Sequence, residues 1–295
     1  MNLPPLLTLL AGLALAGTPF LAQAKPVQAV ASFTLIADMV RTVGGEHVQV
    51  TSLIGPNGDP HVYEPTPADA KALGQADIAF VSGLHLEGWM DRLIQASGYG
   101  HAPVVLTQGI ATRHMSEDGQ QVVDPHAWNS ARNAMQYVRN ITQALDQVDP
   151  AHKVDYERNA QAYLAELDAL DRYARAQVQR IPPERRKVLT SHDAFGYFSD
   201  AYGVTFLAPL GLSTENEASA AQVATLIRQI KQERVSAYFF ENSSDPRLVK
   251  QIASASGARP GGELYVESLS PADGPAPTYI EMFRHNVDTL VAAMK

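Results

Sequence analysis

The sequence predicts an α/β fold made of two lobes, each with a mainly parallel sheet flanked by helices, joined by one long rigid helix. Two patterns support this prediction. Short β-branched runs alternate with helical segments on both sides of the middle of the chain, which is typical of parallel strands covered by helices. Between these regions, a helical pattern of unusual length extends from about residue 150 to Gln179. We therefore expect two α/β units separated by a single helix.

Residues 1–24 are expected to lie outside this fold. They contain no charged side chain, pass through an apolar stretch from Leu6 to Ala16 and end in Ala22-Gln-Ala24. This is the pattern of a signal peptide with its cleavage site, and the stretch is short and interrupted for a membrane span. We expect an exported protein with a cleaved signal peptide, and the absence of cysteine excludes a lipidated N-terminal cysteine.

The first lobe is predicted over residues 25–149. Its opening apolar run, from Val27 to Ile36, predicts a strand that leads into a helix ending at Gly44. The same alternation then continues, and from Ala131 onward apolar residues recur at helical spacing. In chain order we expect further strands at 48–54, 78–82 and 103–106, and helices at 67–75, 87–96 and 131–146.

The linking helix is predicted over residues 150–180 and the second lobe over 181–295. At about 1.5 Å per residue the helix is long enough to cross a small domain. Pro182-Pro183 ends it, because proline cannot continue a helix. In the second lobe we expect strands at 187–190, 203–207 and 237–241, and helices at 219–233, 247–256 and 278–294.

The composition and the absence of common motifs exclude several classes of function. With 23 Lys and Arg against 31 Asp and Glu, the chain lacks the basic surface that nucleic acid requires. The absence of cysteine excludes disulfides and thiolate metal sites and leaves nine histidines as candidate soft ligands. The patterns H-E-x-x-H, Walker A and G-x-S-x-G are also absent, so the sequence offers no motif of a zinc protease, a nucleoside triphosphatase or a serine hydrolase.

Three histidines follow predicted strands. The tripeptide Asp-Pro-His occurs twice, ending at His61 and at His126, and in each case proline stiffens the loop before the imidazole. His192 comes directly after the apolar pair Val188-Leu189, at a strand end, where open α/β sheets place their ligands. These positions favour a metal site, although turns that start a helix and are capped by aspartate remain an alternative interpretation of the two tripeptides.

A carboxylate completes the candidate set. Glu267 follows another apolar step, and three neutral imidazoles with one carboxylate saturate the tetrahedral shell of a divalent cation. Such a closed shell binds a metal and leaves no open position for a catalytic water. Asp273 and Glu241 are rival carboxylates, and His85 is expected in a surface loop.

With these motifs the chain resembles the solute-binding proteins of zinc and manganese ABC transporters. The resemblance covers essentially the whole mature chain and implies two α/β lobes bridged by a long rigid helix, with one metal between the lobes. It rests on five segments in the family's order, which are GDPHVYEP at 58–65, GLHLEGW at 83–89, DPHAW at 124–128, TSHDAFGYF at 190–198 and STENE at 213–217.

The resemblance implies a periplasmic protein that captures Zn²⁺ and delivers it to an ABC transporter permease, and that is not an enzyme. By position His61, His126 and His192 match the family's first three ligands, and Glu267 falls where the family usually has aspartate. Histidine at the third position is the zinc-type residue, whereas manganese-type members have glutamate there. One Zn²⁺ per chain is the expected cargo. A manganese or iron binder of the same class and a zinc hydrolase are the alternatives.

Further expectations concern the partners and one loop. Besides the membrane permease, a periplasmic metallochaperone is a candidate partner, nucleic acid is not, and a monomer is expected. The segment from Arg113 to Val123, with His114, Glu117 and Asp118, lies between glycine and proline breakers, and we predict a mobile flap that influences metal capture without supplying a ligand. Many zinc-type members carry a long histidine-rich loop here, and this chain does not.

Overall fold

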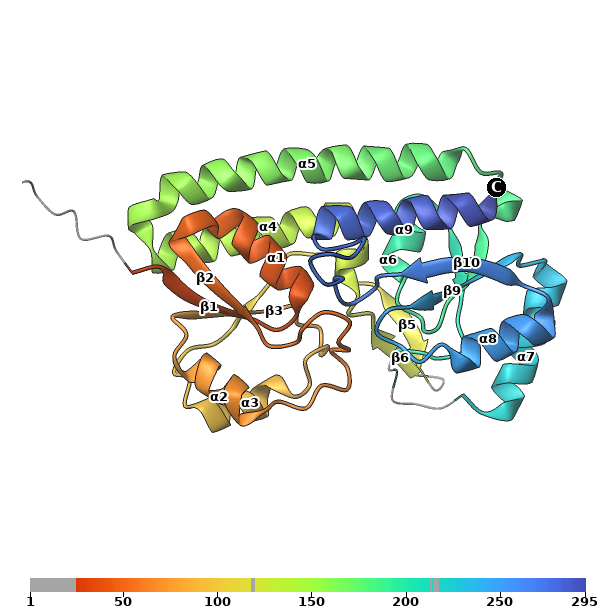
Figure 1. The fold of residues 1–295 in the computed structure, drawn as a ribbon, viewed down its shortest axis with the longest axis horizontal. Helices are drawn as coiled ribbons and strands as arrows, with labels where there is room; N and C mark the ends of the chain where they lie inside the picture. Colours follow the sequence, from red (N-terminus) through yellow and green to blue (C-terminus); the bar gives the residue numbers. More distant parts are fainter. Residues whose placement is uncertain (1–24, 118–119, 213, 215–217) are drawn as a thin grey trace, which may run out of the picture.

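Two parallel four-stranded sheets lie side by side along the long axis of the molecule in the computed structural model (Figure 1). The structure describes residues 25–117, 120–212, 214 and 218–295, so the predicted signal peptide, Asp118 and most of the segment 213–217 lie outside the described residues. The strands of the first sheet, in spatial order, are β2 (Val48–Ser52), β1 (Val27–Ala31), β3 (Ile78–Val81) and β4 (Val104–Val105). Those of the second are β10 (Arg259–Leu264), β9 (Ala237–Glu241), β7 (Lys187–Leu189) and β8 (Thr205–Leu207).

All pairings within these two sheets are parallel, as the alternation of strands and helices predicts. The central strand β3 is buried at all four positions of its sequence Ile-Ala-Phe-Val, because helices cover both faces of a parallel sheet. The helices are α1 (Thr34–Gly44), α2 (Pro67–Gly74), α3 (Met90–Ser97), α4 (Ala131–Val148), α5 (Lys153–Gln179), α6 (Gly196–Tyr202), α7 (Ala220–Glu233), α8 (Arg247–Ser256) and α9 (Tyr279–Met294).

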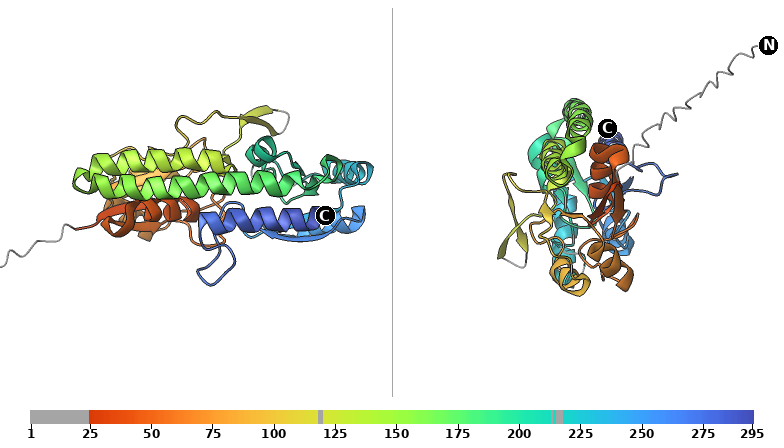
Figure 2. Two further views of the ribbon diagram at one scale, coloured as in Figure 1. Left: turned by 90° about the horizontal axis from the view of Figure 1, so that it is seen from above. Right: turned by 90° about the vertical axis from the view of Figure 1, so that its left-hand side faces the viewer.

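The long helix α5 runs along both sheets. It has 27 residues, about 40 Å at the usual rise per residue. It packs against α1 and α4 beside the first sheet and against α6 and α9 beside the second, and Figure 2 shows α4 and α5 side by side above α1 and α9. The predicted fold class, two α/β units joined by a long helix, is therefore confirmed, while the residue boundaries of the lobes remain a prediction.

Several elements differ from the sequence prediction. Helix α1 begins at Thr34, so Leu35 and Ile36 are buried on a helix and not on the preceding strand. A short apolar run does not reveal where a strand gives way to a helix, which explains this error. Helix α6 was not among the predicted elements, and of strand β10 the sequence predicted the end before Glu267 but no bounds. Among the described residues, none of the helices combines the length and the apolar character needed to cross a bilayer.

The segment predicted as a flap forms an antiparallel hairpin. Strands β5 (His114–Glu117) and β6 (Gln120–Val123) pair with each other and with neither large sheet. The hairpin projects outward from one face of the molecule (Figure 2). Its mobility remains a prediction.

Candidate metal centre

Four predicted ligands meet between the two sheets. Oε1 of Glu267 lies 2.6 Å from Nε2 of His61 and 3.3 Å from Nε2 of both His126 and His192. The Nε2 atoms of His61 and His126 are 3.2 Å apart, and all four ligand atoms lie within 4.8 Å of one another. In a tetrahedral site with bonds near 2.0–2.1 Å, neighbouring ligand atoms are about 3.3 Å apart. The spacing therefore suits a small four-coordinate metal ion.

Each side chain reaches this point from a different element. His192 follows β7 and Glu267 follows β10, at the carboxyl ends of two parallel strands, and His61 lies on the loop after β2. His126 corrects the sequence prediction, because it follows β6 of the hairpin and not a strand of a parallel sheet. The local sequence of a strand does not show which strand it pairs with. The Asp-Pro-His pattern therefore could not predict that His126 follows an antiparallel hairpin.

The two Asp-Pro-His tripeptides form the same local turn. The backbone N–H of His61 donates to Oδ1 of Asp59 at 2.8 Å, and that of His126 donates to Oδ1 of Asp124 at 3.0 Å. Such turns, in which an aspartate side chain accepts from the backbone two residues later, are a common use of this residue. The aspartate does cap a turn, as the alternative interpretation expects, and the same turn points the histidine toward the other ligands.

Two of the imidazoles are also hydrogen-bonded to a carboxylate through Nδ1, the ring nitrogen that faces away from the other ligands. Nδ1 of His126 lies 2.8 Å from Oδ1 of Asp124, and Nδ1 of His192 lies 2.5 Å from Oε2 of Glu241. A carboxylate on Nδ1 sets the tautomer and leaves Nε2 free to bind a metal. Glu241, a rival ligand in the sequence prediction, thus lies behind His192. The sequence analysis did not predict that Asp124 and Glu241 support the imidazoles. For Asp124, its position two residues before His126 could have indicated this role.

Burial points to an ion at this place. The side chains of His126, His192 and Glu267 are fully buried, and that of His61 is 7% exposed. Among the described residues, Nε2 of His192 and Oε2 of Glu267 are buried with no hydrogen-bond partner. Unpartnered buried polar atoms are costly, and a metal bound between these groups would satisfy both.

The charges of the four converging side chains support one another. Burial alone would raise the pKa of Glu267, but the facing imidazoles of His61 and His192 hold it well below its usual value. Burial likewise opposes protonation of His192, yet the carboxylates of Glu241 and Glu267 raise its pKa well above the usual value. The pKa of His126 is raised for the same reason, by Asp124 and Glu267 against burial. A divalent cation entering here takes the place of these protons.

The remaining candidate side chains lie elsewhere. Asp273 is exposed on the loop before α9, and His85 and His114 are exposed as well. Within the described residues they do not join the group of side chains that could hold a metal ion. Asp273 is thus poorly placed to replace Glu267.

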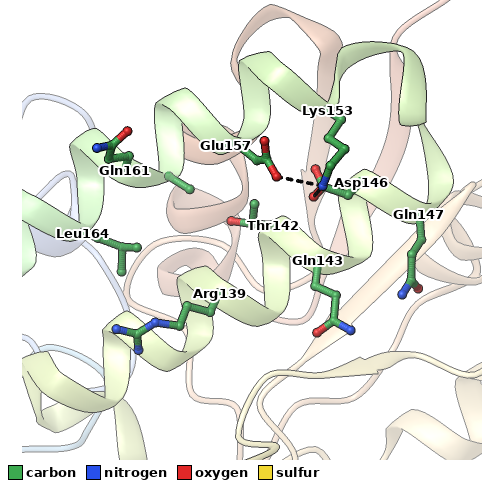
Figure 3. A pocket seen from close by; sticks show the side chains of 10 residues that line it. Arg139, Thr142, Gln143, Asp146, Gln147, Lys153, Glu157, Gln161 and Leu164 are labelled. Atoms are coloured by element: carbon green, nitrogen blue, oxygen red, sulfur yellow. Dashed lines mark hydrogen bonds and ion pairs between the residues drawn. The ribbon is translucent and has the colours of Figure 1, made fainter.

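A separate groove of about 630 Å³ lies between α4 and α5 (Figure 3). No histidine lines it, and its Lys153 forms ion pairs with Asp146 of α4 and Glu157 of α5. None of the four converging ligands contributes to it. This groove is therefore not a candidate for binding a transition metal.

Comparison with known proteins identifies the class of binding protein. The sequence model of the family described as "Zinc-uptake complex component A periplasmic" matches residues 29–293. The iron-binding protein YfeA of Yersinia pestis is 36% identical over 268 residues, which cover 90% of this chain and 86% of that protein. The manganese-binding lipoprotein MntA of Bacillus subtilis is 32% identical, with 92% of this chain and 90% of that protein covered.

Solved structures agree with the sequence comparison. The periplasmic zinc-binding protein TroA of Treponema pallidum superposes with a TM-score of 0.86 at 34% identity, covering 92% of this chain and 99% of that one. A Mn-bound periplasmic metal-binding protein from Candidatus Liberibacter asiaticus superposes with a TM-score of 0.82 at 32% identity, covering 92% of this chain and 100% of that one. The names of these proteins differ in their metal, so similarity alone does not identify the cargo.

Proposed function

The chain belongs to the ZnuA family of periplasmic metal-binding proteins that serve ABC transporters, and we propose that it captures Zn²⁺ between its two lobes for import. The family consists of solute-binding proteins and not of enzymes, and its members hand their metal to a membrane permease. The finer statements, on the metal and on the residues that hold it, are our proposal.

The observation that carries the proposal is the convergence of three imidazole nitrogens and one carboxylate oxygen. We assign His61, His126, His192 and Glu267 as the ligands, because their ligand atoms lie within 4.8 Å of one another. A nitrogen-rich set of four suits Zn²⁺, whereas Mn²⁺ prefers more oxygen ligands and a higher coordination number. The buried Oε2 of Glu267, which has no hydrogen-bond partner, can supply a fifth bond.

A manganese or iron cargo is the second candidate. Relatives of similar identity carry the names of iron-binding and manganese-binding proteins. The same Oε2 of Glu267 would supply an additional hard oxygen to either ion. The two candidates therefore differ in selectivity and not in the place of binding.

We also propose how the protein is organised and where it acts. Residues 1–24 are removed as a signal peptide, and residues 25–149 and 181–295 form the two lobes on either side of the linking segment 150–180. The protein works as a monomer in the periplasm with one Zn²⁺ per chain. The permease is its partner, and a periplasmic metallochaperone is the candidate donor of the metal.

Native mass spectrometry of the purified protein, combined with metal analysis, tests the cargo. The protein is stripped with a chelator and offered equal amounts of Zn²⁺, Mn²⁺ and Fe²⁺ under reducing conditions. We expect one Zn²⁺ per chain and a clearly lower Zn²⁺ affinity in a variant with His192→Ala, which keeps three of the four proposed ligands. Retention of Mn²⁺ or Fe²⁺ in preference to Zn²⁺ would replace the proposed cargo, and a Zn²⁺ affinity unaltered by His192→Ala would refute the site.

A further inference from the structure

Asp124, the carboxylate behind His126, has a second partner on its other oxygen. Oδ1 of Asp124 faces the imidazole, and Oδ2 lies 2.6 Å from Nη1 of Arg113 in an ion pair. The Asp124 side chain is fully buried, and that of Arg113 is 27% exposed. A buried carboxylate requires such compensation, because removing its partner leaves an uncompensated charge in the interior.

The carboxylate behind His192 is held differently. Glu241 accepts from the backbone N–H groups of Ser191 and His192 at 2.9 and 3.2 Å and from the hydroxyl of Ser244 at 3.2 Å. These donors all lie beside the second sheet, and among the described residues no arginine or lysine forms an ion pair with Glu241. Asp124 thus has a cationic side-chain partner in addition to the backbone N–H of His126, whereas Glu241 is held by backbone N–H groups and a hydroxyl.

The structure makes room for the arginine head group with a glycine. A Cβ built on Gly196, the first residue of α6, would lie 1.5 Å from Nη1 of Arg113 and 2.5 Å from Oδ2 of Asp124. No side chain larger than hydrogen is compatible with this arrangement. Nε of Arg113 also lies 3.0 Å from Oδ2 of Asp200 on the same helix. Arg113 therefore sits between α6 and the loop that carries His126.

Arg113 also lies at the base of the β5–β6 hairpin. It immediately precedes β5, and its carbonyl accepts from the backbone N–H of Asp124, just after β6. Near the tip, Oε2 of Glu117 accepts from the backbone N–H of Leu212 at 2.7 Å, and a Cβ on Gly211 would lie 1.8 Å from the same oxygen. Within the described residues the hairpin thus contacts the second lobe at its base and near its tip, and the contact at its base includes Asp124, which faces the proposed ligand His126.

We propose that Arg113 is a positioning residue for metal binding, which acts through Asp124 to hold the imidazole of His126 in its coordinating orientation. This inference rests on the proposed function, because it concerns the same metal centre. According to this proposal, His126 completes the coordination shell only when the head group of Arg113, at the base of the hairpin, lies in the space beside Gly196. Loss of such an outer partner lowers metal affinity by about 10- to 100-fold in comparable sites.

Four variants of the full-length mature protein test the assignment. Arg113→Ala removes the ion pair, Arg113→Lys keeps a charge without the planar head group, and Gly196→Ala displaces the head group while every charged residue is retained. Glu117→Ala removes the contact near the hairpin tip and leaves Gly211 unchanged, because the carbonyl of Gly211 accepts from the backbone N–H of Asp193, beside the proposed ligand His192. Gly100→Ala is the matched control, because nothing lies within 4 Å of a Cβ at that exposed position.

Two measurements are made on each variant. Competition with a chromogenic chelator gives the affinity for Zn²⁺, and the visible absorption of the Co²⁺ complex reports the geometry of the ligands. For Arg113→Ala and Gly196→Ala we expect Zn²⁺ affinity to fall about 10- to 100-fold and the Co²⁺ spectrum to change. Arg113→Lys should retain part of the Zn²⁺ affinity and part of the Co²⁺ spectrum, because lysine supplies the positive charge but not the several N–H donors of a planar guanidinium group. Glu117→Ala and Gly100→Ala leave both unchanged.

The outcomes separate this inference from the proposed function. If the unaltered protein binds neither Zn²⁺ nor Co²⁺, the proposed function fails. If it binds both, and Arg113→Ala and Gly196→Ala keep its affinity and its Co²⁺ spectrum, the role of Arg113 is refuted. The same spectral change in Glu117→Ala would also overturn it, since the hairpin tip would then control the coordination. Should Arg113→Ala fail to fold by circular dichroism, Gly196→Ala decides, because alanine is favourable in a helix.

Discussion

Oε1 of Glu267 lies 2.6 Å from Nε2 of His61, although 206 positions separate the two residues in the chain. The carboxylate follows the last strand of the second sheet, and the imidazole lies on a loop that leaves the first. A metal bound between them would therefore connect the two lobes directly. This contact motivates the first prediction.

Glu267→Ala should weaken Zn²⁺ binding strongly, because it removes the one proposed carboxylate ligand and leaves three imidazoles around a dication in a buried site. Asp273→Ala is the matched control, since that carboxylate is exposed on the loop before α9. Titration of both variants against a competing chelator checks the prediction. A stronger effect of Asp273→Ala would transfer the assignment to Asp273.

His192→Glu should shift selectivity from Zn²⁺ toward Mn²⁺, because a hard oxygen replaces a borderline nitrogen. The new carboxylate would face Glu241, whose Oε2 now lies 2.5 Å from the imidazole, so we also expect weaker binding overall. A competition titration with both metals measures the shift, with His101→Glu at an exposed position as the control. Unaltered selectivity would show that His192 is not a ligand.

The stabilisation of the protein by Zn²⁺ should grow with pH. Asp124 and Glu267 raise the pKa of His126, and Glu241 and Glu267 raise that of His192, in each case against the effect of burial. A raised histidine pKa stabilises the metal-free fold below the ordinary value of about 6.5, and this contribution is lost as pH rises through the folded-state pKa. Zn²⁺ must displace the same protons, so it binds more tightly as they leave.

Thermal unfolding with and without Zn²⁺ checks this dependence. We expect the difference in Tm between the two samples to be small near about pH 5 and to widen toward about pH 8, as the imidazoles lose their protons. A difference in Tm that is constant over this range would contradict a site made of three histidines.

Asp38→Asn should stabilise the protein at neutral pH. Burial raises the pKa of Asp38 from 3.8 to about 6, although its Oδ2 accepts from the backbone N–H of Tyr279 at the start of α9. A raised carboxyl pKa means that the folded state prefers the protonated form, so stability falls as pH rises from the unfolded to the folded pKa. The cost is at most about 3 kcal/mol above that range. Asparagine retains an acceptor for Tyr279 and carries no charge.

Chemical denaturation of the metal-free protein from about pH 3.5 to about pH 8 measures this effect, since both pKa values of Asp38 lie within that range. The stability curves of Asp38→Asn and the unaltered protein should nearly meet at the acidic end, separate between about pH 4 and pH 6 and run parallel above. Asp91→Asn, at an exposed position of α3, is the control. A separation that is independent of pH would show that Asp38 does not titrate as stated.

Much of the architecture could be predicted because it depends on local patterns. The aromatic-rich run of β9 and the helical spacing of α8 have the same limits in the sequence prediction and in the structure. The length of α5 follows from an uninterrupted helical pattern that prolines end. The residue types His and Glu, placed after predicted strands, made candidates of the four side chains that the structure brings together, although Asp273 and Glu241 remained rival carboxylates.

The sequence by itself therefore determined the fold class, the long helix and the set of candidate ligands. Only the tertiary structure decided that His126 arrives from an antiparallel hairpin, that Glu241 lies behind His192 from 49 positions away, and that Gly196 makes room for Arg113. The physical reason is that periodicity and turn chemistry act over a few residues. The orientation and the charge compensation of a metal ligand depend instead on side chains that chain folding brings together from distant segments.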